Sequence, residues 1–480
     1  MTYEAVIGIE THVELLTRSK MFCGCPTDFG AEPNTNVCPV CLGLPGALPV
    51  PNEQAIEWTM SLGLALECVI APHSVFHRKN YFYADLPKNY QISQFDLPLC
   101  TGGHLDVDAG DGPRRVGITR VHLEEDTGKS THLGGSGRIH DASGALIDFN
   151  RSGIPLMEVV TDPDMRTPEE ARAYAQELRA IVLALGISDA RLEEGSLRFD
   201  ANVSLRPAGT DTLGTKVEVK NMNSLRSVQR ALAFEIERQA RVLDSGQPVA
   251  QETRHWDEAA GRTESGRSKE ESSDYRYFTE PDLVPLVVAP GLLDRLHAGI
   301  PELPAARRAR YVAVGLEEAA ARTLVAGGLA GLFDDAVATG ASPRAAANWL
   351  TGEITGHLNR TGIEPEALPI DGARLAELLA MVDAAEISAT AAKDVLAGVL
   401  AGEGSPREVA AGRDLLQISD AGALGAAVDD VLTAHPDEAA RIRGGEGRLV
   451  GFLVGKVMKA TSGKADPKAV DALIRDRTGA

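Results

Sequence analysis

The chain of 480 residues is poor in aromatic residues, which make up 5% of it, and it has no long apolar run. A membrane span needs roughly 18 consecutive apolar residues, and no hydrophobic stretch reaches that length. The first residues, MTYEAVIGIETHVELL, also lack the basic region and cleavage site of a secretory signal. We therefore expect a cytoplasmic protein without membrane contact, whose six cysteines are thiols or metal ligands and not disulfides.

Positive charge is also scarce, since 48 lysines and arginines face 68 acidic residues and leave a net charge of −20. Such a chain does not coat nucleic acid non-specifically, although a local basic patch could still bind RNA. With 44% hydrophobic and 24% charged residues, the composition excludes wholesale disorder. The length predicts roughly two to four domains.

Two common catalytic motifs are missing. EDTGKSTH (residues 125–132) contains Gly-Lys-Ser, but a P-loop needs glycine at position 123, where this chain has leucine. No Gly-x-Ser-x-Gly nucleophile elbow occurs either. Cys68 and Cys100 lie outside nucleophile signatures, so we predict a core cysteine and a turn cysteine, respectively.

The other cysteines form two close pairs, Cys23 with Cys25 and Cys38 with Cys41. Close pairs separated by a short loop predict a tetrahedral Zn²⁺ site, and the alternative is four free buried thiols. Four thiolates fill the coordination sphere and leave no position for a substrate. We therefore predict a structural zinc knuckle that pins the loop between the first strand and the next helix.

Residues 1–290 contain many short alternating segments separated by Gly-, Asp- and Pro-rich turns, which is typical of half-buried strands. Two helices interrupt them, one at 167–186 and one at 223–246. The first begins with a capping box formed by Thr167 and Glu170. Strands with interspersed helices and no steady β-α-β alternation predict an α+β fold.

Beyond residue 290 the pattern becomes Ala/Leu-rich and helical, with frequent capping residues and Gly or Pro breaks. We predict an all-α domain at 291–405 and a small all-α tail domain at 406–480. From Arg441 to Arg477 the tail carries nine basic residues against four acids. This basic patch is either a solvated helix face or a contact for a nucleic-acid backbone.

VIGIETHVEL places Glu10, His12 and Glu14 on one face of a probable strand. Carboxylates with an imidazole suit Mg²⁺ or Mn²⁺, although a solvent-facing polar edge would give the same pattern. A second acidic group, Glu124 to Asp126, follows another strand-like stretch.

Residues 77–94 combine cations with an unusual density of aromatic side chains. Such a mixture suits a nucleotide, because rings stack on the base and cations contact the phosphates, and the alternative is a domain interface. The polar, glycine-containing stretch at 254–278 is typical of a binding loop. It is either a loop that closes over phosphate or a solvated run of charges.

Several segments together resemble the B subunit of the aspartyl/glutamyl-tRNA(Asn/Gln) amidotransferase family. They are GIETHVEL, CPVCLGLPGALPVPN, RKNYFYADLPKNYQISQ, DFNRSGIPLMEVVTDPD, FDANVSLRP, KVEVKNMNSLRSVQRALAFEI, ETRHWDE and RSKEESSDYRYFTEPDLVPL, with LVGFLVGKVMKATSGKADPKAV similar to a YqeY-type tail. The resemblance covers the chain nearly end to end. Ala84 departs from it, because proline is expected there. Some members lack part of the cysteine cluster, which is complete here, so the zinc is expected to be dispensable for the reaction.

The resemblance implies an N-terminal cradle domain with an antiparallel sheet, related to glutamine synthetase, at 1–290. It also implies a reaction: ATP phosphorylates the side-chain carboxylate of Glu-tRNA(Gln) or Asp-tRNA(Asn), and ammonia then displaces the phosphate. Ammonia would come through a channel from glutamine hydrolysed by an amidase, the A subunit, and a small C subunit would complete a heterotrimer. The implied cofactors are ATP, Mg²⁺ or Mn²⁺, and a structural Zn²⁺.

On this basis we assign candidate roles within the matching segments. The candidate magnesium ligands are Glu10, His12, Glu125, Glu158 and Asp200. The candidates for neutralising phosphate charge are Lys79, Arg151 and Lys220. Tyr81 and Tyr83 would frame a pocket for ATP or the terminal adenosine, and a loop with Asp274 and Tyr275 would close over it. The candidate tRNA-binding residues of the tail are Lys456, Lys459 and Lys464.

Two other functions fit part of the pattern: a non-catalytic, zinc-stabilised tRNA adaptor, and a free-standing ammonia-dependent ligase. Because the chain has no recognisable amidase signature, the pattern favours one subunit of a larger enzyme over a self-sufficient one.

Overall fold

A computed structural model describes residues 2–110, 112–134, 143–266, 275–363, 365–417, 421–461 and 463–479. The chain divides into two compact units, Met1–Pro304 and Ala305–Ala480, which are described separately. No helix among the described residues is long and apolar enough to cross a bilayer.

The first unit is built on a nine-stranded sheet. Its neighbours are antiparallel except for β12 and β13, which run parallel. In spatial order the strands are β14 (Arg262–Ser265), β13 (Thr253–Asp257), β12 (Val217–Lys220), β11 (Leu197–Pro207), β1 (Tyr3–Glu14), β10 (Pro155–Thr161), β7 (Pro113–Glu125), β6 (Cys100–Asp108) and β2 (Val69–Ile70).

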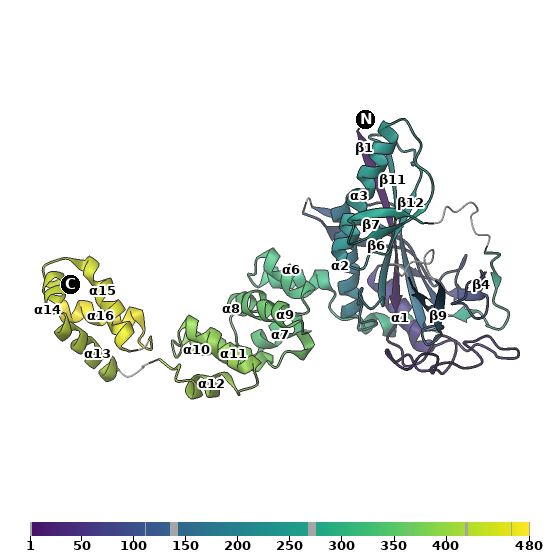
Figure 1. Ribbon diagram of the computed structural model, residues 1–480. Helices are drawn as coiled ribbons and strands as arrows, with labels where there is room; N and C mark the ends of the chain where they lie inside the picture. Colours follow the sequence, from purple (N-terminus) through teal and green to yellow (C-terminus); the bar gives the residue numbers. More distant parts are fainter. Residues whose placement is uncertain are drawn as a thin grey trace. The chain divides into compact units, whose positions relative to one another are not determined.

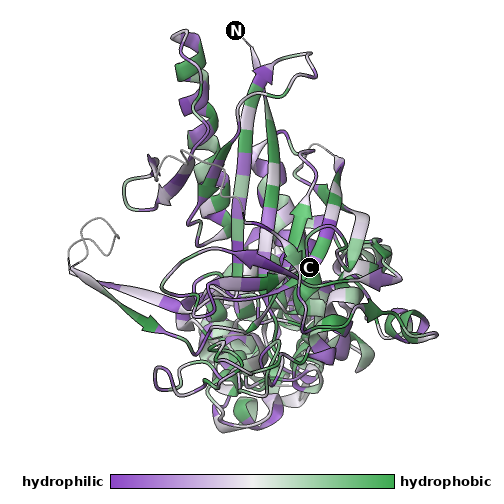
Figure 2. Ribbon diagram, turned by 90° about the vertical axis from the view of Figure 1, so that its right-hand side faces the viewer, coloured by the Kyte–Doolittle hydropathy of each residue, from purple (hydrophilic) through white to green (hydrophobic). Residues whose placement is uncertain are grey.

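The two faces of this sheet differ in polarity because the strands alternate, visible as coloured bands in Figure 2. On β1, Ile7, Ile9 and Val13 are buried in the main core, whereas Glu10 and His12 lie on the opposite face. The helices α1 (Glu53–Ala65), α2 (Pro168–Ala184) and α3 (Leu225–Asp244) pack against the sheet and share this core (Figure 1). The apolar face is therefore covered, and the polar face is left for the site.

Local capping explains where α2 begins and ends. Thr167 accepts a hydrogen bond from the Glu170 N–H, as predicted, and Gly186 follows the helix in the left-handed conformation. The Glu170 carboxylate, however, accepts from the N–H of Arg166 and not from the cap residue itself, so the predicted capping box is displaced by one residue.

The two remaining cysteines of this unit are both buried. Cys68 is a core residue, as predicted. The prediction of a turn was wrong for Cys100, which is fully buried and opens β6, where its thiol lies against the Thr59 carbonyl of α1.

Smaller sheets complete the first unit. They are β15-β4-β5 (Phe278–Thr279, His77–Asn80, Tyr90–Ser93), β16-β3 (Leu286–Val287, His73–Ser74) and the hairpin β8-β9 (Lys129–Leu133, Gly144–Asp148), and α4 (Leu292–Ala298) follows them. The three-stranded sheet packs on β7, since Gln91 and Ser93 of β5 both donate hydrogen bonds to β7 residues. The three-stranded sheet thereby borders one end of the polar face.

All secondary-structure elements among the described residues of the second unit are helices or helical turns (Figure 1, green to yellow). It contains α5 (Pro304–Ala313), α6 (Glu318–Ala326), α7 (Ala330–Ala338), α8 (Pro343–Trp349), a π-helical turn (Leu350–Ile354), α9 (Thr355–Thr361), a 3₁₀ turn (Pro365–Ala367), α10 (Gly372–Asp383), α11 (Ala389–Leu400), α12 (Pro406–Gly412), α13 (Ala421–Ala434), α14 (Pro436–Arg443), a second 3₁₀ turn (Gly447–Leu449), α15 (Val450–Ala460) and α16 (Pro467–Thr478). Its buried apolar residues form two clusters, within 311–410 and 424–474.

The mixed α and β character of the N-terminal part and the helical C-terminal part are confirmed. The likeness to glutamine synthetase and the domain boundaries at 290 and 405 stay predictions.

Candidate active site

Three strands of the polar face bring one imidazole and two carboxylates together. His12 of β1 lies opposite Glu158 of β10 in the sheet register, and β10 in turn pairs with β7, which carries Glu124. The His12 Nε2 is 3.8 Å from the Glu158 Oε2 and 3.9 Å from the Glu124 Oε1. One ligand atom from each residue lies within 4.8 Å of the others, so a single ion could contact all three.

This donor set fits a divalent cation that prefers oxygen. Two carboxylates and an imidazole are common ligands of Mg²⁺ and Mn²⁺. The neighbours hold the carboxylates in place: the His122 Nε2 lies 3.2 Å from the Glu158 Oε2, and the Ser93 Oγ donates to the Glu124 Oε2 over 3.2 Å. Such outer contacts fix ligand orientation.

Lys79 of β4 interacts electrostatically with Glu124 and Glu158 of this cluster. Burial lowers the pKa of its ammonium, but the carboxylates of Glu124 and Glu158 outweigh burial and raise that pKa above its usual value. The Lys79 Nζ is also 5.0 Å from the centre of the Tyr275 ring. A fixed positive charge therefore stands beside the candidate metal ligands.

A second group of charges adjoins the first along β1, β11 and β12. Glu10 pairs with Asp200 in the register and accepts a hydrogen bond of 3.1 Å from the Asn202 amide. Burial, with the nearby carboxylates of Glu158, Glu218 and Asp200, raises the pKa of Glu10. The Lys220 Nζ lies 2.7 Å from Asp200 and 3.2 Å from Glu218, so this lysine already forms ion pairs with two acids of this second group.

Two other predicted residues lie beside the cluster and not in it. The Glu125 carboxylate accepts from the Ile92 N–H over 2.9 Å and pairs with Lys88. The Arg151 guanidinium donates to the carbonyl oxygens of Thr127 and Gly128, at 3.0 Å each, and lies 3.6 Å from an oxygen of Asp126. The structure thus brings Glu124, and not Glu125, to His12 and Glu158.

Asp126 anchors the end of β7. The Arg198 Nη2 donates to its carboxylate over 2.9 Å. Glu14 faces the same carboxylate, and burial together with Asp126 raises the pKa of Glu14 to about 9. The guanidinium groups of Arg198 and Arg151 lower the pKa of Asp126, so the proton of this pair resides on Glu14.

A cavity of about 300 Å³ opens above the floor and is lined by Glu10, Lys79, Arg120, His122, Glu158 and Tyr275, among others. Aromatic rings form one wall: Phe95 stacks on Tyr277 at 4.2 Å between ring centres, and Tyr275 lies 5.9 Å from Tyr277. Tyr81 continues this row, 6.2 Å from Tyr275 and 6.3 Å from Tyr83. Predicted Tyr81, Tyr83 and Tyr275 are thus together, and Asp274 lies outside the described residues.

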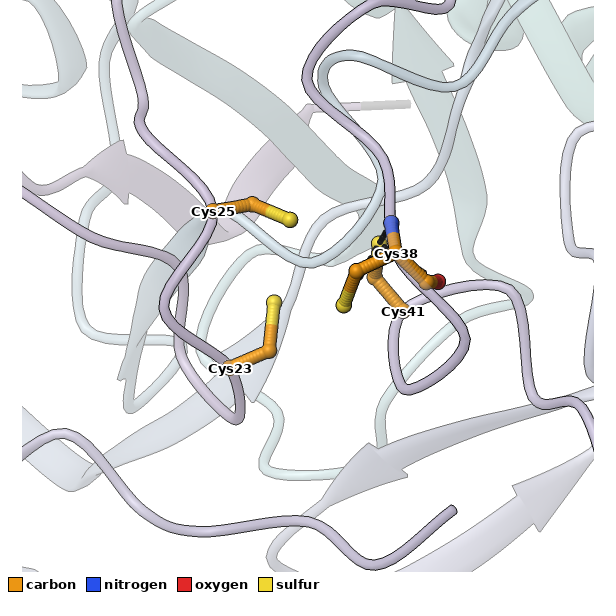
Figure 3. Close-up of side chains that lie close together, drawn as sticks. All are labelled: Cys23, Cys25, Cys38 and Cys41. Carbon is orange, nitrogen blue, oxygen red and sulfur yellow. Dashed lines mark hydrogen bonds between the residues drawn. The ribbon is translucent and has the colours of Figure 1, made fainter. Parts of the chain in front are cut away.

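The four cysteines of the predicted knuckle converge (Figure 3). Cys23 and Cys25 face Cys38 and Cys41, and the Cys38 N–H donates to the Cys41 Sγ over 3.1 Å. Hydrogen bonds from the Cys23 thiol and this N–H, with Lys20 nearby, lower the pKa of Cys41 to about 5. The hydrogen bond to Cys41 raises the pKa of Cys23, and burial raises that of Cys25, so the thiolate lies on Cys41. The four sulfurs lie within 4.8 Å of one another, which suits zinc.

The knuckle loop is bound to the segment that leads into β10. Asn34 donates to the Ile147 carbonyl over 3.1 Å and accepts from the Phe149 N–H over 2.8 Å. The Lys20 Nζ lies 3.1 Å from the Phe149 carbonyl oxygen and 3.8 Å from the Cys41 sulfur. The knuckle therefore braces the approach to the strand that carries Glu158.

The predicted tRNA-binding lysines lie on or after α15. Lys459 is exposed, and the Lys456 Nζ is 5.0 Å from the centre of the Phe452 ring. Lys464 pairs with Asp414, so part of its charge is already neutralised.

The sequence did not single out Glu124 as a ligand, nor His122 and Arg120 as cavity residues. Alternation along ITRVHLEED places all three on one face of a strand, which was a usable signal. The pairing of β1 with β10 and of β10 with β7 brings these β7 residues close to His12. That pairing cannot be predicted from any single segment of the sequence.

The region that contains this site matches a known protein family. A family profile described as the GatB/GatE catalytic domain matches residues 5–294, and one described as the GatB domain matches residues 331–477. Proteins named as the B subunit of aspartyl/glutamyl-tRNA(Asn/Gln) amidotransferase are similar over almost the whole chain. The chain belongs to this family.

Two relatives show how close the similarity is. The B subunit from Frankia casuarinae is 56% identical to this chain, over 99% of this chain and 96% of its own length. That of Salinispora arenicola is 53% identical over 100% of this chain and 97% of its own length. The first matched region contains the whole His12–Glu124–Glu158 cluster and the knuckle, and the second contains the tail lysines. Members of this family are subunits of an amidotransferase.

Proposed function

We propose that this chain is the part of a tRNA-dependent amidotransferase that activates the side-chain carboxylate of Glu-tRNA(Gln), Asp-tRNA(Asn) or both. The relatives are named for the aspartyl/glutamyl-tRNA pair. The observation that carries the proposal is the His12–Glu124–Glu158 cluster, whose Glu158 lines one cavity together with Lys79. Carboxylates are poor electrophiles, so ATP must first convert the side chain to an acyl phosphate that ammonia can attack.

In such a reaction the protein positions its reactants and neutralises charge. His12, Glu124 and Glu158 would hold Mg²⁺ or Mn²⁺, with Glu10 and Asp200 close by. When bound, the ion offsets negative charge on phosphate oxygens. Lys79 would contribute a second positive charge, whereas Lys220 and Arg151 would hold the surrounding carboxylates and backbone in place.

The aromatic wall would position the nucleotide or the terminal adenosine of the tRNA. Aromatic faces stack on bases without regard to sequence, which suits a substrate end common to all tRNAs. Phe95 and Tyr277, whose rings stack on each other, would cover one side of the bound reactants and limit the access of water to an acyl phosphate.

The ammonia is proposed to come from glutamine hydrolysed by a partner amidase, the A subunit, with a small C subunit to complete a cytoplasmic heterotrimer. A channel within the assembly would deliver ammonia to the cavity. Ammonium salts supplied to this chain alone would support amidation if it were a free-standing ligase. We expect them to support it only in the assembled enzyme.

The decisive experiment measures ATP hydrolysis by the assembled enzyme with Glu-tRNA(Gln), with Asp-tRNA(Asn) and with the uncharged tRNAs. We expect hydrolysis to depend on the misacylated form, and the comparison identifies which substrate is used. A complex that binds both tRNAs but hydrolyses no ATP in response to either would be an adaptor, and the proposed activity would be wrong.

The basic tail gives a further prediction. Replacing Lys456 and Lys459 with alanine should weaken tRNA binding and lower the slope of log affinity against log salt by about one for each phosphate that is no longer bound. Lys464→Ala should lower it less, because Asp414 already pairs with that ammonium. Filter binding over a range of salt concentrations measures both.

Lys393→Ala is the matched control for the tail. This lysine is also exposed and helical, but it pairs with Glu353 outside the tail. An unchanged affinity and salt slope in the double variant, or an equal loss in the control, would remove the tail from the tRNA interface.

A further inference from the structure

Arg120 on β7 lines the cavity and carries a charge that no carboxylate of the described residues neutralises. It lines the same cavity as Lys79, His122 and Glu158. The register between β10 and β7 shifts at this point, because Val160 pairs with Arg120 and Thr161 pairs with Ile118. Such bulges redirect side chains and are common beside active sites.

The Arg120 guanidinium has no hydrogen bond or ion pair among the described residues, and its Nε is buried without a partner. The neighbouring arginines of the same strand are paired: Arg114 with Glu170 at 3.0 Å, and Arg115 with Asp106 at 2.9 Å. A buried donor without an acceptor destabilises the folded protein, so the orphaned Nε calls for an explanation.

The position of Arg120 along β7 limits which ligand its guanidinium could bind. Arg120, His122 and Glu124 alternate along one face of β7, so Arg120 stands roughly 7 Å along the strand from His122 and roughly 14 Å from Glu124. Its planar fork is suited to two parallel hydrogen bonds with a phosphate or a carboxylate. The cation thus lies across the cavity floor from the candidate metal ligands.

We propose that Arg120 binds an oxyanion of the substrates, either a phosphate of ATP or the side-chain carboxylate of the aminoacyl group. This role rests on the proposed function, since both anions belong to that reaction. Arg120 is then a binding residue for the reactants, and its free Nε is the donor that the ligand satisfies.

The test compares Arg120→Ala and Arg120→Lys with wild type in the assembled enzyme. If Arg120 binds phosphate, Arg120→Ala weakens equilibrium binding of ATP on the order of 10- to 100-fold, the range expected for removal of a charge-assisted hydrogen bond, and leaves the KM for misacylated tRNA unchanged. If it binds the carboxylate, ATP binding is unchanged and kcat/KM for misacylated tRNA falls by a similar factor, while uncharged tRNA binds normally.

Two further measurements separate binding from a general effect of charge. Arg120→Lys should recover only part of the loss, because an ammonium cannot reproduce the fork. Guanidinium ion at millimolar concentration should partly restore Arg120→Ala. Full activity of the lysine variant would instead indicate a diffuse electrostatic role and overturn the proposal.

Arg115→Ala is the control, since that arginine lies on the same strand, is exposed and pairs with Asp106. It should match wild type in every measurement. An active wild type with Arg120→Ala unchanged in both ATP binding and tRNA kinetics would overturn the role of Arg120 alone. A wild type without tRNA-dependent ATP hydrolysis would overturn the proposed function and this role with it.

Discussion

Glu124→Gln should abolish tRNA-dependent ATP hydrolysis, with a loss on the order of 10³-fold, while tRNA binding and folding are retained. The amide has the size of the carboxylate but lacks its charge, and a metal ligand of this kind contributes several kcal/mol to stabilising a transition state. The Ser93 hydroxyl can still donate to the amide oxygen of the variant, so the protein should keep its fold. Phosphate release and filter binding with misacylated tRNA measure the two effects.

Glu125→Gln provides the contrast, one residue away. The Glu125 carboxylate pairs with Lys88, whose side chain is 6% exposed, and breaking a buried pair costs about 3–5 kcal/mol. We therefore expect a lower melting temperature and nearly normal turnover by the folded protein. If Glu125→Gln instead lost turnover at unchanged stability, and Glu124→Gln kept it, the metal would lie with Glu125.

The second large effect concerns the cysteine cluster. We propose that the cluster binds zinc. The double variant Cys38→Ser, Cys41→Ser should then lose the metal and several kcal/mol of unfolding free energy, because metal binding to such sites is coupled to folding. At low temperature the folded fraction should keep its turnover, since four thiolates leave no position for a substrate. Zinc content, thermal unfolding and phosphate release measure the three quantities on one preparation.

Cys68→Ala is the matched control, as this cysteine is buried but outside the cluster. It should keep its zinc and cost no more than about 1 kcal/mol, as is common for a small core change. Loss of turnover in molecules that remain fully folded after zinc removal would give the knuckle a direct part in the reaction, through the segment that Asn34 and Lys20 hold before β10.

Local signals in the sequence predicted much of this molecule. The cap at Thr167 and glycine after the helix located α2, and alternation located β1 with Glu10 and His12 on one face. The spacing of the cysteines predicted a cluster that the fold brings together. Each of these depends on residues close together in the chain, where propensity and pattern act directly.

What the sequence could not supply is pairing between distant strands. His12 meets Glu158 across 146 positions only because β1 and β10 are neighbours in a particular register. The choice between Glu124 and Glu125 depends on the same register together with the packing of β5 on β7, which gives Glu125 to Lys88 and Ile92. A shift of one residue would exchange the two acids.

The acidic floor of the cavity has an energetic cost that is present before any substrate arrives. Burial and the carboxylates of Glu158, Glu218 and Asp200 raise the pKa of Glu10, so the ionised form of Glu10 is destabilised in the empty protein. Glu10→Gln should therefore stabilise the empty protein while it removes a carboxylate from the proposed site, which is the usual trade-off between stability and activity. A cation that binds only the folded state stabilises it by mass action. Selection for this chemistry therefore limits the folding stability of the protein without ligands. The stability of the protein in the cell then depends on the concentration of the cation that it binds.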